Sequence, residues 1–321
     1  MKLLILKRED VTKLLPMREC ISVMEKALTR LAEGEGVLPL RTIIATLDKS
    51  GFLGTMPSVL GSSMGVKVIS VFPGNEGTEF DSHLGAVLLF ETKNGQLLAV
   101  MDATEITAIR TAAVSGVATN LLARKNAGDL AILGSGTQAR THLQAIQSVR
   151  ELRRIRIWSR NYDHAVAFAE TWQSGIEPMR SAEEAVAGAD IICTVTSTAE
   201  PILRGAWISA GAHINAAGSS QPQKRELDSA AVIKSKLFVD RRESTINEAG
   251  DFLVPKREGV ITDGHIRGEI GELLLKRIIG RESDQEITLF KSLGIAVEDV
   301  AAAEYIYQKA IKEGAGTLVD F

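Results

Sequence analysis

The chain has 321 residues, a length that suggests two domains because a single domain is typically about 150 residues long. Its 37 Lys and Arg residues against 40 Asp and Glu residues give a net charge of −3, which argues against a nucleic-acid-binding surface, since such surfaces carry a basic excess. The two cysteines, Cys20 and Cys193, lie far apart in apolar segments and exclude both a disulfide framework and a cysteine-based zinc site.

The N-terminal sequence does not have the pattern of a targeting segment. MKLLILKRED contains four consecutive apolar residues before charges return, too few for a signal peptide. No uncharged apolar stretch reaches the length of about 18 residues that a membrane-spanning helix needs. We therefore expect a cytoplasmic protein with neither a membrane nor a nucleic acid as partner.

The first third of the chain predicts helix and then strands. Over residues 1–33 apolar side chains recur at spacings of three and four, which predicts helix. These side chains are Leu14, Met17, Ile21, Met24, Leu28 and Leu31. Short β-rich runs separated by turn residues then predict strands at 41–46, 52–56, 65–72, 84–91 and 96–101. Because the links are short, we expect antiparallel neighbours, followed by a long helix over 103–124.

From residue 128 the pattern changes to strands that alternate with helical segments. The strands are expected at 131–136, 154–159, 190–197, 213–218 and 236–240. This alternation implies βαβ units and a parallel sheet. A final helix over 294–314 could return to the first domain. The expected fold class is α/β, with a Rossmann-type dinucleotide-binding domain and an α+β domain that contains an antiparallel sheet.

A glycine loop opens the alternating region. Residues 129–140 fit G-x-G-x-x-A, with Gly134 for a tight turn, Gly136 for close approach of a pyrophosphate and Ala139 for close helix–strand packing. The loop residues Ser135, Thr137 and Gln138 complete the candidate phosphate site, because amides at a helix start face a bound anion. The alternative is a purely structural turn.

The end of the next strand indicates which dinucleotide is bound. An NAD enzyme usually places Asp or Glu there, whereas this chain has Ser159, Arg160 and Asn161. An arginine can pair with a 2′-phosphate and stack on adenine. We therefore expect NADP(H) as the preferred cofactor, with NAD(H) possible, and a solvated loop arginine as the alternative role of Arg160.

Three basic residues occur in apolar patterns. Lys67 shares a strand face with Ile69, Arg110 lies on the apolar stripe of the 103–124 helix, and Arg41 shares a strand face with Ile43. Buried cations are costly unless they are paired. In one interpretation each pairs with an internal carboxylate. In the other they converge on a cavity, where arginine binds a substrate carboxylate and a desolvated lysine donates a proton.

The five histidines show no spacing typical of a metal site, so we expect no bound metal. His83 is the candidate of most interest because it precedes a strand, in a loop that also contains Glu79 and Asp81. It is kept as a substrate-binding candidate, with an ordinary surface histidine as the alternative.

Several stretches of the chain resemble a known family. The stretches that carry the resemblance are LLAVMD (97–102), ITAIRTAAVS (106–115), AVAGAD (185–190), EPIL (200–203), GAHIN (211–215), RELD (225–228) and FKSLGIAVED (290–299). Together they are similar to the ornithine cyclodeaminase/mu-crystallin family over nearly the whole chain, and most of all to its ketimine reductases of the mu-crystallin type.

The resemblance implies a two-domain subunit. Residues 1–115 with 295–321 would form a substrate-binding and dimerisation domain, and 116–294 a Rossmann NAD(P)-binding domain. The antiparallel sheet would build a homodimer. Arg41, Lys67 and Arg110 match the residues that hold the substrate carboxylate in the family, in agreement with the face analysis. The residues implied to lie near the cofactor are Thr111, Thr196, Ser197, Ser292 and Leu293.

One residue departs from the cyclodeaminase pattern. Cyclodeaminases have an aspartate where this chain has Ser220, and the ketimine reductases have a serine there. Because a serine cannot act as a carboxylate base, the resemblance favours direct hydride transfer, with Lys67, Arg110 and Ser220 as catalytic residues.

The expected function is therefore NAD(P)H-dependent reduction of a small, cyclic or linear, α-imino carboxylate to the L-amino acid. The alternatives within the family are an alanine-type amino-acid dehydrogenase and an ornithine cyclodeaminase. An alternative of another class is an NADPH-dependent small-ligand-binding or crystallin-like protein.

Overall fold

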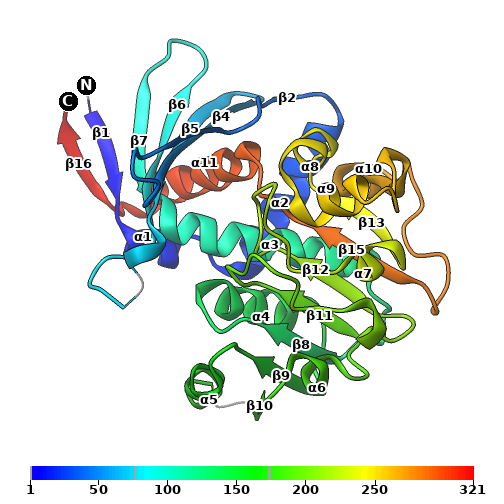
Figure 1. Cartoon of the computed structure of the whole chain (residues 1–321). Helices are drawn as coiled ribbons and strands as arrows, with labels where there is room; N and C mark the ends of the chain where they lie inside the picture. The colour runs from blue at the N-terminus through cyan, green and yellow to red at the C-terminus, as the bar shows by residue number, and fades with distance from the viewer. Residues whose placement is uncertain (1, 76, 173–174) are drawn as a thin grey trace. The chain divides into compact units, whose positions relative to one another are not determined.

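The structure, a computed structural model, describes residues 2–75, 77–172 and 175–321 (Figure 1). The chain divides into two compact units: unit 1 comprises Met1–Arg110 and Ile295–Phe321, and unit 2 comprises Thr111–Gly294. The first boundary lies within a helix, somewhat before the expected residue 115. Each unit contains one sheet.

In unit 1 the described residues form an eight-stranded sheet in the order β16-β1-β7-β6-β5-β4-β2, with β3 also paired to β4. Its strands are β1 (Lys2–Leu6), β2 (Gly36–Val37), β3 (Thr42–Ala45), β4 (Phe52–Leu60), β5 (Ser63–Val71), β6 (His83–Glu91), β7 (Leu97–Asp102) and β16 (Thr317–Asp320). Strands β4 to β7 pair antiparallel in chain order, which confirms the prediction from the short links.

The N-terminal segment corrects one prediction. Residues 1–33 were expected to be helical throughout, but β1 is a strand that pairs parallel with β7 and antiparallel with β16. The two ends of the chain therefore lie side by side (Figure 1). Periodicity cannot distinguish helix from strand in an apolar run as short as LLIL, so long-range pairing decided the outcome.

Helices cover one face of this sheet. The helices of unit 1 are α1 (Arg8–Leu14), α2 (Met17–Ala32), α11 (Ala296–Glu313) and the first part of α3 (Ala103–Leu122), with a short 3-10 helix η1 (Pro73–Asn75). Helix α11 packs on β4, β5 and α2. A Cβ atom built on Gly65 of β5 would lie 3.0 Å from the Val300 side chain of α11, so this side of β5 faces the helix. Lys67, two residues on, has the same orientation.

In unit 2 the described residues form an eight-stranded sheet in the order β10-β9-β8-β11-β12-β15-β13-β14. All of its pairings are parallel. The strands are β8 (Asp129–Leu133), β9 (Arg154–Trp158), β10 (Ile176–Met179), β11 (Ile191–Thr194), β12 (His213–Ala216), β13 (Ser235–Val239), β14 (Ile266–Glu269) and β15 (Ile287–Lys291).

Helices and buried side chains cover both faces of this second sheet. The helices of unit 2 are α4 (Thr137–Val149), α5 (Tyr162–Glu170), α6 (Ala182–Val186), α7 (Ser229–Ile233), α8 (Arg242–Glu248), α9 (Gly250–Arg257) and α10 (Ile270–Leu274), with 3-10 helices η2 (Gly205–Trp207) and η3 (Asp263–His265). Alternate residues of β8 belong to two different core clusters, Leu130 and Ile132 to one and Ala131 and Leu133 to the other. The expected α/β fold class is confirmed. Strands β10, β14 and β15 were not predicted.

The strand order of this sheet reverses its direction at one point. After β8 the chain passes through α4 to β9 and β10 on one side, and then crosses to β11 on the other side of β8. Ligands of open parallel sheets bind at the carboxyl ends of the strands where the order reverses in this way. In this sheet that point lies between the ends of β8 and β11.

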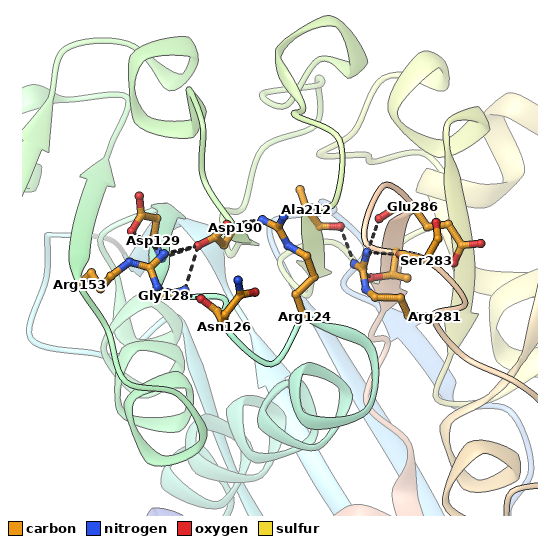
Figure 2. Close-up of polar contacts among 11 residues, drawn as sticks. Arg124, Asn126, Gly128, Asp129, Arg153, Asp190, Ala212, Arg281, Ser283 and Glu286 are labelled. Carbon is orange, nitrogen blue, oxygen red and sulfur yellow. Dashed lines mark hydrogen bonds and ion pairs between the residues drawn. The ribbon is translucent and has the colours of Figure 1, made fainter.

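At the opposite, amino-terminal ends of the strands, ion pairs link neighbouring segments (Figure 2). Asp190, just before β11, accepts hydrogen bonds from the backbone N–H groups of Gly128 and Asp129, at 2.9 and 3.1 Å. The same carboxylate pairs with Arg153 at 2.8 Å and with Arg124. One side chain thus ties the starts of β8 and β11 together.

Arginines also satisfy the carbonyl groups at the end of α3. The Arg281 Nε donates to the Leu122 carbonyl at 2.7 Å. Its Nη2 donates to the Ala212 carbonyl at 3.1 Å (Figure 2). Arg150 donates to the Thr119 carbonyl at 2.9 Å. The last carbonyls of a helix have no partner within the helix and form its negative end, so cations stabilise them.

Candidate active site

Unit 1 buries a cluster of four charged side chains contributed by β5, α3 and α11. The Lys67 Nζ lies 2.7 Å from the Asp299 Oδ2, and the lysine side chain is 1% exposed. The Arg110 guanidinium bridges two carboxylates, with Nε 2.9 Å from Asp299 and Nη1 2.9 Å from Glu298. The predicted burial of Lys67 and Arg110 is confirmed. Each of these two cations has an internal carboxylate partner, as the first interpretation requires, and Asp299 contacts both.

The cluster shifts the pKa of its members. Burial and the positive charge of Arg110 lower the pKa of Lys67 to about 8, while Asp299 opposes that shift. Burial alone would raise the pKa of Asp299, but the charges of Arg110 and Lys67 outweigh it and lower that pKa. Lys67 is therefore protonated at neutral pH and yet holds its proton less firmly than an exposed lysine.

The Lys67 ammonium group has more N–H donors than partners among the described residues. Its three N–H bonds can each donate. The ion pair with Asp299 engages the ammonium group on one side, and the Thr107 hydroxyl accepts a hydrogen bond at 3.4 Å. Among the described residues the third N–H bond of Lys67 has no partner. An ammonium group with one donor available and a lowered pKa is suited to hydrogen bond to a ligand and to transfer a proton to it.

Arg41 and His83 lie differently from the predictions. Arg41 was expected on a buried face with Ile43, but Arg41 is half-buried just before β3 and Ile43 is 48% exposed. The charge of Arg41 nevertheless lowers the pKa of Lys67. His83 is the first residue of β6 and is exposed, rather than in the preceding loop. Partial desolvation and then the charge of Lys67 lower the pKa of His83.

In unit 2 the predicted glycine loop connects β8 to α4. Gly134 has φ +127°, and a Cβ there would lie 2.7 Å from the Val195 carbonyl oxygen, so only glycine fits between the ends of β8 and β11. Gly136 is the N-cap of α4, and a Cβ there would meet nothing within 4 Å. Ala139 is fully buried in the sheet–helix core, as predicted.

These features fit a dinucleotide. The space beside Gly136 is open, the neighbouring Ser135 and Thr137 are not buried, and the first amides of the 13-residue helix α4 point toward that space. Two buried polar atoms, the Ser292 Oγ and the Gln138 Oε1, have no hydrogen-bond partner among the described residues. Both belong to residues predicted to contact the cofactor, and a bound polar ligand would give them a partner.

The residues after β9 differ from one another in role. The Ser135 hydroxyl donates to the Ser159 hydroxyl at 3.0 Å, which ties the glycine loop to the end of β9. Arg160 is exposed. Asn161 caps α5 by accepting a hydrogen bond from the Asp163 N–H at 3.0 Å, a structural role that the sequence analysis did not assign to it.

The remaining predicted residues lie at the carboxyl edge of this sheet or at the start of unit 2. Thr196 follows β11 and donates to Glu226 from both its N–H and its hydroxyl, at 2.7 and 2.8 Å. Ser197 is exposed, and Thr111 is buried within α3. The Leu293 N–H, after β15, donates to the Asp240 carboxylate at 2.6 Å.

Ser220 is half-buried in the loop after β12. The preceding Ser219 is buried; its carbonyl accepts a hydrogen bond from Lys291 at 2.6 Å, and its hydroxyl donates to the Lys224 carbonyl at 2.7 Å. The backbone just before Ser220 is therefore held on both sides. No carboxylate occupies residue 220, as the sequence already showed.

Sequence reasoning missed the carboxylates of both units. Glu298 and Asp299 belong to a quoted motif, but no role was assigned to them, and Glu226 was likewise only part of a motif. Glu298 and Asp299 interrupt an otherwise apolar helical run from Ala296 to Ala303, and both are fully buried. The rule that singled out Lys67 and Arg110, a charge within an apolar pattern, would have found them as well.

Among the described residues no helix is long and apolar enough to cross a membrane. The fold and the glycine loop are those of a class of protein, the dinucleotide-dependent oxidoreductases. The model of the ornithine cyclodeaminase/mu-crystallin family matches residues 1–314, and the chain belongs to this family. The expected family and the expected class, an oxidoreductase, are confirmed.

Relatives match over most of their length. The mouse protein named ketimine reductase mu-crystallin is 41% identical over 294 residues, 89% of this chain and 90% of that protein. The structure of a Thermococcus litoralis Δ1-pyrroline-2-carboxylate reductase in complex with NADH and L-proline is 42% identical, with a TM-score of 0.95 over 98% of this chain and 99% of that one. An archaeal alanine dehydrogenase dimer with bound NAD has a TM-score of 0.95 and 33% identity over all of both chains.

Proposed function

We propose that this protein reduces a small cyclic α-imino carboxylate to the L-amino acid, with NADPH as the preferred reductant. The observation that carries the proposal is the buried Lys67–Arg110–Asp299 cluster, in which the ammonium group lies 2.7 Å from its counter-ion and has a lowered pKa. Family membership and the relatives named for imine and ketimine reduction support it.

Unit 1 supplies the groups for the substrate. Lys67 and Arg110 form ion pairs with Glu298 and Asp299, and the charge of Arg41 also reaches this cluster, because it lowers the pKa of Lys67. Arg110 and Arg41 bind the substrate carboxylate in this proposal. Lys67 donates a hydrogen bond to the imine nitrogen and then transfers its proton there, while Asp299 keeps the ammonium group in place.

Unit 2 supplies the groups for the dinucleotide. The α4 N-terminus with Gly134 and Gly136 holds the pyrophosphate, and Ser292 and Gln138 satisfy their polar atoms on the bound ligand. When bound, the reduced nicotinamide supplies the hydride that reaches the imine carbon. The exposed Arg160, at the end of β9 where a carboxylate is absent, supports a preference for NADPH over NADH.

Ser220 orients the substrate or a water molecule in this proposal. Its hydroxyl can donate and accept hydrogen bonds but cannot act as a carboxylate base. This is the residue that argues against ornithine cyclisation. The similarity to the archaeal alanine dehydrogenase keeps an amino-acid dehydrogenase as the second candidate function.

One substrate panel tests these functions together. The purified protein is given NADPH or NADH with cyclic and linear imino acids, and separately NAD+ with alanine or ornithine, and loss or gain of dihydronicotinamide absorbance is followed. We expect the highest kcat/KM with NADPH and a cyclic imino acid. Turnover of alanine or ornithine alone would replace the proposal by the corresponding alternative, and cofactor binding without turnover of any compound would support a ligand-binding protein.

We further propose a homodimer formed through the open face of the unit 1 sheet. In the strand register Ile44, Leu53, Ser70 and Leu84 form one row across β3 to β6, on the side opposite to Lys67. Ile44 is 64% exposed and Leu53 44% exposed, an apolar surface that a monomer rarely presents. Light scattering after gel filtration should give twice the chain mass for the wild type and the monomer mass for Leu53→Asp.

A further inference from the structure

Unit 2 buries a second charged cluster that the proposed function has not used. It consists of Glu226, Asp251 and Lys291, all almost completely inaccessible. The Lys291 Nζ lies 3.0 Å from the Asp251 Oδ2. The other Asp251 oxygen accepts the backbone N–H groups of Glu226 and Leu227, at 2.8 and 2.9 Å. Asp251 therefore connects Lys291 to the segment that carries Glu226.

Glu226 forms hydrogen bonds with two loops at the carboxyl ends of the strands. One carboxylate oxygen accepts the N–H and the hydroxyl of Thr196, at 2.7 and 2.8 Å. The other accepts the Thr194 hydroxyl at 2.9 Å and the Gly218 N–H at 2.8 Å. Thr194 is the last residue of β11, Thr196 lies in the loop that follows, and Gly218 follows β12. Two of the four donors are backbone N–H groups, which cannot reverse their role.

Lys291 holds the second of these loops from the other side. At the end of β15 its Nζ donates to the Ala216 carbonyl at 3.2 Å and to the Ser219 carbonyl at 2.6 Å, in addition to its ion pair with Asp251. Two N–H groups of the ammonium group therefore form hydrogen bonds, and its charge is paired with Asp251. Both groups are engaged by segments of the protein itself.

We propose that Glu226, supported by Asp251 and Lys291, is a positioning residue that sets the loops 194–198 and 216–220 for dinucleotide and substrate binding. The inference deepens the proposed function and rests on it. The loop after β11 begins at Val195, whose carbonyl closes on Gly134 of the phosphate loop, and the loop after β12 carries Ser220. Both lie at the edge where parallel sheets bind ligands.

The test uses Glu226→Gln. An amide presents its NH2 group where one carboxylate oxygen was, and in either orientation that group faces a backbone N–H, of Thr196 or of Gly218. We expect faster hydrogen exchange of these two amides and a rise of the NADPH dissociation constant of about tenfold or more, since small displacements of binding groups are costly. The dissociation constant is measured by dihydronicotinamide fluorescence, without substrate.

Asp190→Asn is the matched control. Asp190 is a carboxylate of the same sheet that also accepts two backbone N–H groups and pairs with cations, but at the opposite, amino-terminal edge (Figure 2). The control variant should lower the melting temperature without changing NADPH affinity or the exchange of the Thr196 and Gly218 amides. A Glu226→Gln variant that behaves like this control would overturn the inference.

Two further measurements protect the test against misfolding of Glu226→Gln. Thr194→Val removes one donor and leaves Glu226 in place, and it should weaken NADPH binding about threefold. In the wild type, the Thr196 and Gly218 amides should exchange as slowly as strand amides, and exchange at the rate of free loops would overturn the inference. A wild type that binds NADPH but reduces no imino acid would contradict the proposed function alone.

Discussion

The two units each bury a group of charges, but the surroundings shift the pKa values of the carboxylates in opposite directions. In unit 1 Asp299 contacts two cations, and their charges lower its pKa despite complete burial. In unit 2 burial raises the pKa of Glu226, because Lys291 only partly compensates it and Asp251 adds a negative charge. The described residues offer Lys67 of unit 1 one ion pair and one hydrogen bond, whereas both carboxylate oxygens of Glu226 in unit 2 accept hydrogen bonds from its own loops.

This difference separates a site for a ligand from a support for loops. A buried cation with a lowered pKa and an available donor can bind an anion and exchange a proton. A carboxylate that already accepts four hydrogen bonds from the protein, as Glu226 does, keeps those donor groups in place and has no role in binding a ligand directly. Burial and charge alone do not distinguish the two cases, whereas counting donors and acceptors does.

The largest effect is expected for Lys67→Met. This change removes the proton donor at nearly constant volume and should lower kcat/KM for the imino acid about a thousandfold. NADPH affinity should stay unchanged, because the phosphate loop belongs to unit 2. Lys67→Arg serves as the control that keeps the charge without an easily lost proton. A Lys67→Met enzyme with wild-type kcat/KM would remove the distinction between the two charge groups.

Asp299→Asn should destabilise unit 1. It removes the carboxylate that both Lys67 and Arg110 contact, and breaking a buried ion pair typically costs about 3 kcal/mol of unfolding free energy or more. In the wild type kcat/KM should fall as pH rises through about 8, where Lys67 loses its proton. Because Asp299 raises the pKa of Lys67, the variant should lose activity at a lower pH. Urea denaturation and a pH profile measure the two effects, and an unmoved profile would exclude coupling between the two residues.

His142 should make unit 2 sensitive to acid. It is fully buried, bonded to Ser115 at 2.9 Å and to the Gln138 carbonyl at 2.8 Å, and burial lowers its pKa from 6.5 to about 4. The stabilising contribution of a neutral histidine is complete above the unfolded pKa and is lost as pH falls toward the folded one. From pH 7 to pH 5 this amounts to about 2 kcal/mol.

The change that tests this contribution is His142→Gln. The variant should flatten the pH dependence of the unfolding free energy by that amount, whatever its absolute stability. Urea titrations at both pH values provide the measurement. An equal slope in the variant and the wild type would assign the acid sensitivity to other groups, among them His213, whose pKa burial lowers to about 3.

The smallest effect is expected for Arg160→Ala. Loss of a charge-assisted contact to a 2′-phosphate should reduce kcat/KM with NADPH about tenfold and leave the value with NADH unchanged. Arg154→Ala at the other end of β9, where the arginine pairs with Glu177, is the matched control. Equal losses with both cofactors would show that Arg160 does not recognise the phosphate.

Much of the architecture could be predicted from local patterns. Alternation predicted β4 to β7, the strand–helix alternation predicted the parallel sheet, and the pattern from Gly134 to Ala139 predicted the tight turn between β8 and α4. The N-terminal strand could not be found in this way, because β1 exists only through its pairing with β7 and β16. Arg41 was wrongly placed on a buried face for a similar reason, since strand alternation does not reveal whether a helix covers that face.

The candidate site also has features that local sequence predicts and features that depend on long-range packing. Local sequence was enough for part of the site. It predicted the tight turn at Gly134 and the burial of Lys67 and Arg110. The partners of those cations lie on α11, about 190 positions farther along the chain than Arg110. Which carboxylate meets which cation, and which donors close on Glu226, depend on how distant segments pack. Tertiary packing gives Lys291 two carbonyl acceptors and Lys67 a single hydroxyl acceptor, because hydrogen-bond partners come from the assembled neighbours and not from the residue itself.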